Sequence, residues 1–366
     1  MTCDLLSLAA PGVAALQAYH PGKPVEELER ELGLTGIVKL ASNENSLGPS
    51  PKVIEGLSSL PDLARYPDGN GFVLKLALSE SLQVEPAQIT LGNGSNDVLE
   101  LAARAFVTDK HQVIFSEHAF AIYPTITQAI GAEAVVVPAK EWGHDLAAMQ
   151  AAITDATRLV FIANPNNPTG TCLDAASMLQ FLQALPEHVI VVMDEAYFEY
   201  AQADDYPDCI AWIRLYPNLI VSRTFSKAYG LAGLRVGYGI SHPDVADLMN
   251  RVRQPFNVNR VALHAAQIAF QDSQHIAQSV DMNHTGMQQL IAGFDSMGIH
   301  FIPSRGNFIS IDLQQPAIDI YEQLLRQAVI VRPIANYGMP NHLRVTVGLK
   351  QENEKFLSAL ATVLAA

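Results

Sequence analysis

The sequence has few cysteines, no excess of basic charge and no long apolar run. Its three cysteines, Cys3, Cys172 and Cys209, are an odd set without CxxC spacing, so neither a disulfide framework nor a zinc knuckle is expected. The formal net charge of −14 argues against the basic surface that a nucleic-acid partner requires. No segment reaches the roughly 18 consecutive apolar residues of a membrane span. The first residues lack the basic charge of a secretory signal, so a cytoplasmic protein is expected.

Metal chemistry is not indicated either. The eleven histidines show no HExxH or comparable ligand spacing, so no metal site is predicted. The negative net charge also means that the overall field of the protein does not attract an anionic substrate. Any phosphate site must therefore depend on local arginines.

The length and the periodicity of the chain predict an α/β protein of two parts. With 366 residues and 49% hydrophobic content, the chain can form a main domain and a smaller one. Five strand-like runs alternate with helix-like stretches, which predicts a mainly parallel sheet covered on both faces; the runs are 113–116, 134–137, 159–163, 189–193 and 219–222. A helical pattern from about residue 259 to 297 leaves this sheet. We expect a large domain over 61–272 and a smaller, discontinuous α/β domain formed by 1–60 and 273–366.

One lysine stands in an apolar, glycine-rich segment, SRTFSKAYGLAGLRVGY, at residues 222–238. Apolar and short polar neighbours would desolvate the amine of Lys227, which lowers its pKa and frees it for Schiff-base chemistry. Arg235 could offer a planar fork to a phosphate group. On its own, such a pair is also compatible with a solvated surface lysine.

Two upstream segments place polar side chains at the ends of buried strands. The segment VVMDEAY ends a strand pattern at Asp194, which puts this acid at the carboxyl edge of the sheet, where ligands bind in open α/β folds. A carboxylate there could pair with a protonated pyridine nitrogen. The segment RLVFIANPNNPTG places Asn167 in a turn rich in proline and glycine.

A third segment, ITLGNGSNDVLELAARAF, predicts a short strand, a glycine turn and an amphipathic helix. Gly94, Ser95 and Asn96 would lie at the start of this helix. Unpaired backbone N–H groups at a helix start attract phosphate. The segment lacks the third glycine of a dinucleotide fingerprint, so a dinucleotide is not indicated.

The order of these motifs is more specific than any one of them, and it resembles the fold-type I pyridoxal-phosphate-dependent aminotransferases over nearly the whole chain. Within that family, the flanking segments YHPGKPVEELERELGL, KLASNENSLGPSP, RYPDGNG and NYGMPNHLRVTVG are similar to those of the histidinol-phosphate aminotransferases. The resemblance implies a homodimer with pyridoxal 5'-phosphate that interconverts L-histidinol phosphate and 2-oxoglutarate with imidazole-acetol phosphate and L-glutamate in histidine biosynthesis. Aminotransferases of aromatic amino acids and pyridoxal-phosphate-dependent phospho-amino-acid decarboxylases share most of these segments. A binding protein without turnover is a further alternative.

The resemblance also implies roles for individual residues toward the cofactor. Lys227 would bind it covalently and move the proton, Asp194 would keep the ring nitrogen protonated, and Tyr197 with Asn167 would donate to the ring oxygen. Phe120 would stack on the ring, although an ordinary core phenylalanine is the alternative. The cofactor phosphate would be held by Gly94, Ser95, Asn96, Thr224, Ser226 and Arg235, with Tyr66 reaching it from the second subunit.

Two arginines in strand patterns, Arg332 and Arg344, are candidates for substrate binding. An arginine in an apolar strand is costly to bury without an anionic partner. The resemblance makes that partner the substrate phosphate or the glutamate carboxylate, with Tyr19, Asn43 and Asn307 nearby. An internal salt bridge is the alternative.

Overall fold

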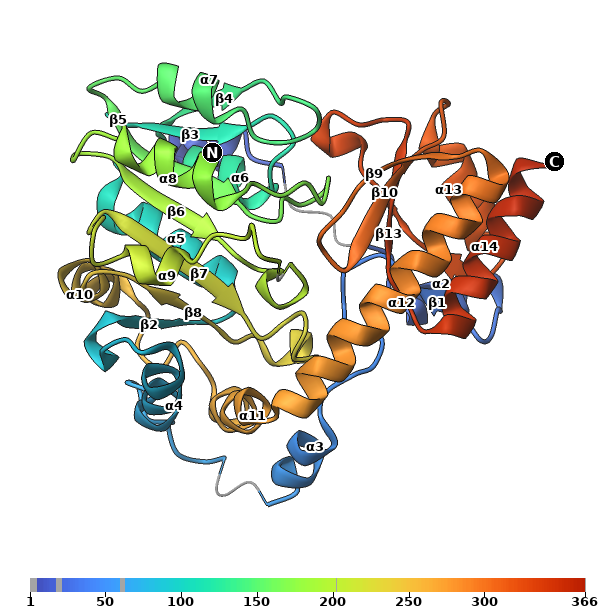
Figure 1. Cartoon of the computed structure of the whole chain (residues 1–366), viewed down its shortest axis with the longest axis horizontal. Coiled ribbons are helices and arrows are strands. Elements are labelled where there is room, and N and C mark those ends of the chain that lie inside the picture. The colour runs from blue at the N-terminus through green and yellow to red at the C-terminus, as the bar shows by residue number, and fades with distance from the viewer. Residues whose placement is uncertain (1–4, 18–21, 60–62, 202, 366) are drawn as a thin grey trace.

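A seven-stranded sheet lies at the centre of the larger part of the molecule (Figure 1). The computed structural model describes residues 5–17, 22–59, 63–201 and 203–365, so Tyr19 and Cys3 lie outside the described residues. The strand order is β2–β8–β7–β6–β5–β3–β4, with β2 (Ile89–Gly92), β3 (Gln112–Ser116), β4 (Glu133–Val137), β5 (Thr157–Ala163), β6 (Ile190–Asp194), β7 (Leu219–Thr224) and β8 (Gly237–Ile240). Strand β8 is antiparallel to both of its neighbours, and the other pairs are parallel. The expected mainly parallel sheet is confirmed.

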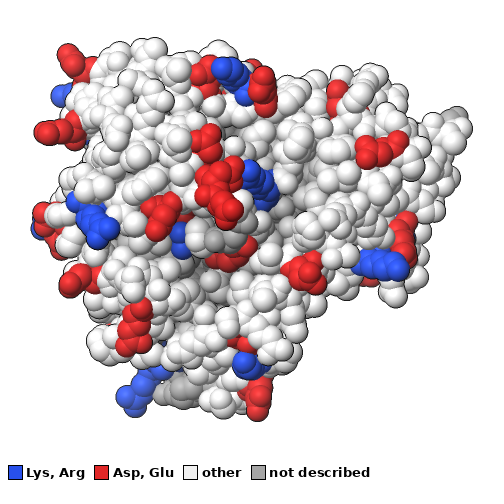
Figure 2. Space-filling model, in the orientation of Figure 1, with Lys and Arg blue, Asp and Glu red and all other residues white. Residues whose placement is uncertain are grey.

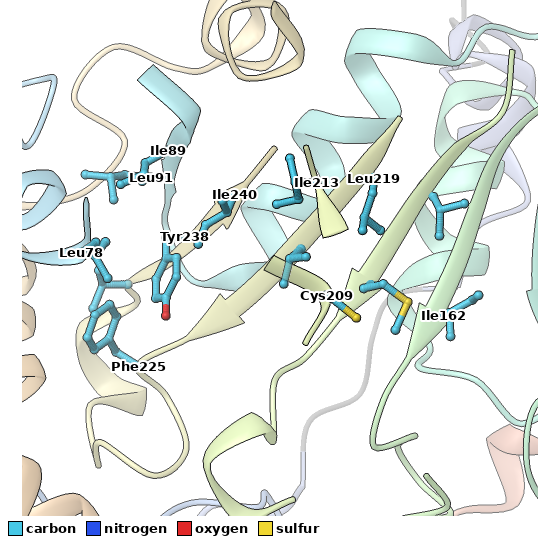
Figure 3. Packing of buried hydrophobic residues seen from close by; sticks show 14 of the residues in the cluster. Leu78, Ile89, Leu91, Ile162, Cys209, Ile213, Leu219, Phe225, Tyr238 and Ile240 are labelled. Carbon is cyan, nitrogen blue, oxygen red and sulfur yellow. The ribbon is translucent and has the colours of Figure 1, made fainter. Parts of the chain in front are cut away.

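Alternate residues of the central strands enter two separate apolar cores, as the pleat of a strand requires. In β5, Leu159 and Phe161 face one core, whereas Val160 and Ile162 face the other. The first core is closed by α5 (Ser95–Phe106), α6 (Ile122–Ile130) and α10 (Pro243–Val252). The second core, part of which is shown in Figure 3, is closed by α3 (Pro51–Leu57), α4 (Phe72–Leu82), α7 (Leu146–Ala151), α8 (Ala175–Gln183), α9 (Cys209–Trp212) and α11 (Arg260–Gln271). Helices on both faces leave the carboxyl ends of the strands as the open edge.

The C-terminal part of the chain forms a second sheet with its own core. Its four strands are antiparallel in the order β12–β13–β10–β9, with β9 (His300–Ile302), β10 (Phe308–Asp312), β12 (Arg332–Pro333) and β13 (His342–Thr346). They pack against α12 (Ser273–Met297), α13 (Ala317–Arg326) and α14 (Lys350–Leu364). A short parallel pair, β1 (Val38–Lys39) with β11 (Val329–Ile330), joins the N-terminal segment to this part, beside α2 (Val25–Leu32).

The remaining elements are short. Helix α1 (Pro11–Ala14) packs on α6. In the described part of the chain, single turns of 3-10 helix lie at Leu6–Leu8, Pro86–Gln88, Phe198–Tyr200, Ala232–Leu234 and Ala335–Tyr337. No helix within the described ranges is both long and apolar enough to cross a membrane.

The helical stretch expected from 259 to 297 is two helices rather than one. Asp272 separates α11 from α12 with φ −96° and ψ 68°, which is not helical. Its carboxylate accepts hydrogen bonds from Ser50 and Lys52, so contacts with a distant segment hold the break. Helix α12 then runs from the neighbourhood of α11 to the four-stranded sheet (Figure 1). The division into domains at residues 61 and 273 stays a prediction.

Candidate active site

A cavity of about 290 Å³, called here the central cavity, lies where the carboxyl ends of β5, β6 and β7 face β12 and β13. It brings together most of the residues that the sequence singled out. Those that line it are Asn43, Ser95, Asn96, Phe120, Asn167, Asp194, Tyr197, Thr224, Ser226, Lys227, Arg235, Arg332 and Arg344. Asp194 and Thr224 belong to the seven-stranded sheet, and Arg332 and Arg344 belong to the four-stranded sheet, so the cavity depends on the packing of the two parts.

Four of the predicted site residues do not line the cavity in the described structure. Tyr19 lies outside the described residues. Tyr66 is 78% exposed and stacks on Phe256, with 4.6 Å between the ring centroids. Asn307 is buried behind Asn43 and donates to its carbonyl oxygen. Gly94 lies directly before Ser95, and a Cβ atom there would be 2.5 Å from the guanidinium of Arg235.

Asp194 is the last residue of β6, and its carboxyl group is buried at the floor of the cavity. The hydroxyl of Tyr123 donates to Oδ2 at 2.9 Å. Oδ1 accepts no well-formed hydrogen bond within the described residues, although the N–H of Ala196 lies close enough to help lower the carboxyl pKa. Burial dominates and raises the pKa of Asp194 to about 6. A buried carboxylate oxygen without a partner favours a positively charged or hydrogen-bonding ligand.

Lys227 follows β7, and its amine reaches into the same cavity. Nζ donates to the carbonyl oxygen of Ser42 at 3.2 Å. Burial lowers the pKa of Lys227 to about 7, with Arg344 and Arg235 contributing in the same direction and Glu44 and Asp194 opposing them. A substantial fraction of the amine is therefore neutral near pH 7, which is the form that attacks carbonyl groups.

Four polar side chains form two hydrogen-bonded pairs at the cavity wall, Arg344 with Asn167 and Asn43 with Tyr197. The Arg344 guanidinium donates to Oδ1 of Asn167 and, at 2.8 Å, to the carbonyl oxygen of Ala41. Asn43 donates through Nδ2 to the hydroxyl of Tyr197 at 2.9 Å. The Nδ2 of Asn167 and the O–H of Tyr197 remain as donors for a ligand. Burial raises the pKa of Tyr197 to about 12, so this hydroxyl keeps its proton.

The start of α5 forms a cradle of donors beside Lys227. Gly94 precedes the helix with φ 80° and, as a glycine at the N-cap position, offers no side chain to cap the first turn. Nη1 of Arg235 donates to the hydroxyl of Ser226 at 3.3 Å. The hydroxyl of Thr224 accepts from the N–H of Ser226 at 3.1 Å. Free N–H groups at a helix start, one guanidinium and two hydroxyls suit an oxyanion such as phosphate.

The cavity also contains residues that sequence reasoning missed as site residues, among them Tyr337, Gly22, Ser42, Pro165 and Ala196. Tyr337 falls in the segment NYGMPN, which carried the resemblance but no stated role. His118 holds the Tyr337 segment through a contact of 2.7 Å between Nδ1 and the Tyr337 carbonyl oxygen. No group of three potential metal ligands occurs among the described residues.

Comparisons with known proteins agree with this geometry. The family model of aminotransferase class I and II matches residues 35–360. This chain belongs to the class I and II aminotransferase family. Histidinol-phosphate aminotransferase 2 of Pseudomonas fluorescens is 62% identical over 100% of both chains, and that of Pseudomonas aeruginosa is 58% identical over 99% of both. The crystal structure of histidinol-phosphate aminotransferase from Sinorhizobium meliloti with pyridoxal-5'-phosphate superposes with a TM-score of 0.90, at 30% identity over 97% of both chains.

Proposed function

We propose that this aminotransferase uses pyridoxal 5'-phosphate to interconvert L-histidinol phosphate and 2-oxoglutarate with imidazole-acetol phosphate and L-glutamate, in histidine biosynthesis in the cytoplasm. The observation that carries the proposal is one cavity that holds Lys227, Asp194 and Arg344 together. The names of the full-length relatives supply the substrate, because two of them at 58% and 62% identity are histidinol-phosphate aminotransferases.

The residues present fit the cofactor at both of its ends. Oδ1 of Asp194, buried without a good partner among the described residues, suits a protonated ring nitrogen. At the other end, Gly94 allows Arg235 to approach the start of α5, where a side chain would collide with the guanidinium. Ser95, Asn96, Thr224 and Ser226 complete a phosphate site there.

Each residue around the reacting atoms has a separate task. When bound, the cofactor supplies an electron sink for the charge that develops at the substrate Cα. Lys227 supplies the amine that binds the cofactor and, when released, accepts the proton from Cα and returns it. Asp194 holds the proton on the ring nitrogen through its ionised carboxylate. Tyr197 and Asn167 donate to the ring oxygen, because their other hydrogen-bonding groups are already used by Asn43 and Arg344.

The substrate phosphate is assigned to Arg344 and Arg332. Both line the cavity, and the hydrogen bonds of Arg344 go to neutral oxygens of Asn167 and Ala41. Among the described residues, no carboxylate therefore balances its charge at hydrogen-bonding distance. Figure 2 shows acidic side chains spread over one face of the molecule with basic ones scattered between them. Recognition of an anionic substrate thus depends on these local guanidinium groups.

A donor panel on the purified protein tests the assignment. With 2-oxoglutarate as acceptor, kcat/KM for L-histidinol phosphate should exceed that for L-histidinol by at least about a hundredfold, since several charge-assisted hydrogen bonds are lost without the phosphate. Equal turnover of phenylalanine would instead favour an aminotransferase of aromatic amino acids. Release of carbon dioxide from a phosphorylated amino acid would favour a decarboxylase.

The homodimer is part of the proposal and involves the segment around Tyr66. Arg260 donates to the carbonyl oxygens of Tyr66 and Arg65 at 2.7 and 3.3 Å, so this exposed segment is held in place. The same region exposes several large apolar side chains, which favours contact with a second copy; they are Leu63, Tyr66, Phe72, Val73 and Phe256. We infer that Tyr66 reaches the cofactor phosphate of the partner subunit across a two-fold axis.

Hybrid dimers test this arrangement. Lys227→Ala and Tyr66→Ala chains carrying different affinity tags are unfolded, mixed, refolded and separated. If Tyr66 serves the partner's site, one site of the hybrid carries both defects and the other carries none, so activity should approach half of the wild-type value. Activity at or below the mean of the two parent dimers would assign Tyr66 to its own subunit.

A further inference from the structure

Tyr123 lies outside the lining of the central cavity but contacts a residue at its floor. It belongs to the first turn of α6, and its side chain is fully buried. Its hydroxyl donates to Oδ2 of Asp194 at 2.9 Å. Burial and the adjacent carboxylate raise the pKa of Tyr123 well above its ordinary value, so the phenol keeps its proton and acts as the donor.

The ring of Tyr123 is fixed from several sides. It stacks on Phe161 of β5 with a centroid distance of 4.5 Å and an interplanar angle of 2°. It also meets Phe120 edge to face, at 5.9 Å and 90°, and lies 6.4 Å from the ring of Phe115. One rigid side chain therefore contacts both Asp194 and Phe120, two of the residues assigned to the cofactor ring.

This contact leaves the two oxygens of Asp194 in different situations. Oδ2 is satisfied by Tyr123, whereas Oδ1 has no well-formed partner among the described residues. Burial raises the pKa of this carboxyl group, and the hydrogen bond from Tyr123 opposes that effect by stabilising the ionised form. The other charged groups acting on Asp194 are Glu195, which disfavours its ionised form, and Lys227, which favours it.

We propose that Tyr123 is a positioning residue that holds Asp194 ionised and directs its free Oδ1 toward the ring nitrogen of the cofactor. The inference rests on the proposed function, because it assigns to Asp194 the role of partner to that nitrogen. Tyr123 itself touches neither cofactor nor substrate and acts only through Asp194.

Cofactor binding to the ligand-free protein tests the proposal without any measurement of turnover. Tyr123→Phe removes the hydroxyl and keeps the ring. Its dissociation constant for pyridoxal 5'-phosphate at pH 7, followed by visible absorbance, should rise about tenfold, as expected for the loss of one hydrogen bond to a charged group. The pH at which affinity is lost on acidification should move upward by about one unit, because the carboxylate has lost a donor.

Tyr238→Phe is the matched control. Tyr238 is as deeply buried, in β8, and its hydroxyl faces Arg223 rather than the cavity; Figure 3 shows it within the apolar core. This variant should change the dissociation constant less than about twofold. In an Asp194→Asn background, Tyr123→Phe should also have little further effect, because no carboxylate remains to be held. The proposal would be overturned if Tyr123→Phe left the dissociation constant unchanged. It would also be overturned if Tyr238→Phe raised the dissociation constant as much, or if Tyr123→Phe raised it as much in the Asp194→Asn background.

A second readout separates this proposal from the proposed function. The infrared carboxyl band that disappears in Asp194→Asn reports the protonation of Asp194 in the ligand-free protein. Tyr123→Phe should raise the pH midpoint of that band by about one unit. If the wild-type protein bound no pyridoxal 5'-phosphate, the proposed function would fail, and this titration would still decide whether Tyr123 holds Asp194 ionised.

Discussion

The central cavity has two walls with different chemistry. The first, called here the sheet wall, consists of Asp194, Lys227 and their neighbours at the ends of β5 to β7. The second, called here the arginine wall, consists of Arg332 and Arg344 of β12 and β13. Burial brings the pKa of Asp194 to about 6 and that of Lys227 to about 7, so the amine of Lys227 gains and loses its proton near neutral pH while Asp194 is mostly ionised there. Guanidinium groups stay charged under all such conditions.

On the proposed function, this difference would separate the residues that carry out the reaction from those that recognise the substrate. Groups that gain and lose protons near pH 7 are suited to general acid–base chemistry. Groups of fixed charge and planar geometry are suited to binding carboxylates and phosphates. We therefore expect substitutions in the sheet wall to abolish turnover of every substrate, and substitutions in the arginine wall to change the choice of substrate.

The largest effect is expected from Lys227→Ala. On the proposed function, Lys227 is both the amine that binds the cofactor and the group that moves the proton, so kcat of the variant should fall by at least about 10³-fold for every donor. In the wild-type protein, borohydride should fix the cofactor to the peptide that contains Lys227, as read by mass spectrometry. An adduct mainly on another lysine would remove Lys227 from this role.

A smaller but selective effect is expected from Arg344→Ala. Loss of charge-assisted hydrogen bonds should lower kcat/KM for histidinol phosphate by an amount that corresponds to about 3 kcal/mol of transition-state stabilisation. The value for unphosphorylated histidinol should fall much less. Steady-state kinetics with both donors measures the difference. Equal losses on the two donors would show that Arg344 serves the structure or another part of the substrate, and the distinction between the two walls would not hold.

The pH dependence of stability tests the sheet wall alone. The pKa of Lys227 is about 7 in the folded protein and about 10.5 when unfolded, so between these values the unfolded chain binds more protons. Folding stability of the ligand-free protein should therefore rise as the pH rises from about 7 to 10.5. Because the cavity is open to water, we expect the free energy of unfolding to rise by only about 1–2 kcal/mol from pH 7 to pH 10 on account of Lys227. Urea unfolding of the wild type and of Lys227→Met at both pH values measures this rise, as the part that the wild type shows and the variant lacks. A parallel dependence in both proteins would assign the effect to other groups.

The sheet wall could be predicted from the sequence better than the rest of the site. Apolar runs that end in Asp194 or lead into Lys227 mark strand ends directly, and parallel strands bring their carboxyl ends together. For the arginine wall, the residues themselves predicted only two arginines in strand patterns that need an anionic partner, and the resemblance supplied the substrate as that partner. That Arg344 contacts Asn167, which is 177 residues away in the chain, follows from the packing of the two sheets.

Other features of the structure could not be predicted from the residues that surround them in the sequence. Tyr123 lies in an apolar helix pattern, where a core aromatic is the ordinary interpretation, and its partner Asp194 is 71 residues away. The break at Asp272 carries neither proline nor glycine, so a continuous helix was the natural prediction. The role predicted for Tyr66 stays a prediction for a different reason, because it requires a second subunit that a single chain does not contain.

The smallest effect is expected from an ion pair that joins the two parts of the molecule outside the cavity. Arg305, in the loop after β9, contacts Asp205 through two hydrogen bonds of 2.7 and 2.8 Å, and its backbone N–H donates to the carbonyl oxygen of Gly170 at 2.9 Å. Both side chains are well exposed, 39% and 50%, so water and salt screen the attraction.

Arg305→Ala keeps the backbone contact and removes the ion pair with Asp205, together with the interaction of the guanidinium with the side chain of Cys172. Urea unfolding at pH 7 should show a loss of no more than about 1 kcal/mol, and this loss should shrink in 0.5 M salt. The ratio of kcat/KM for histidinol phosphate to that for histidinol should stay unchanged, which makes this variant the control for Arg344→Ala. If Arg305→Ala instead reduced that ratio as strongly as Arg344→Ala, substrate choice would depend on how the two parts are held together and not on the charge of the arginine wall.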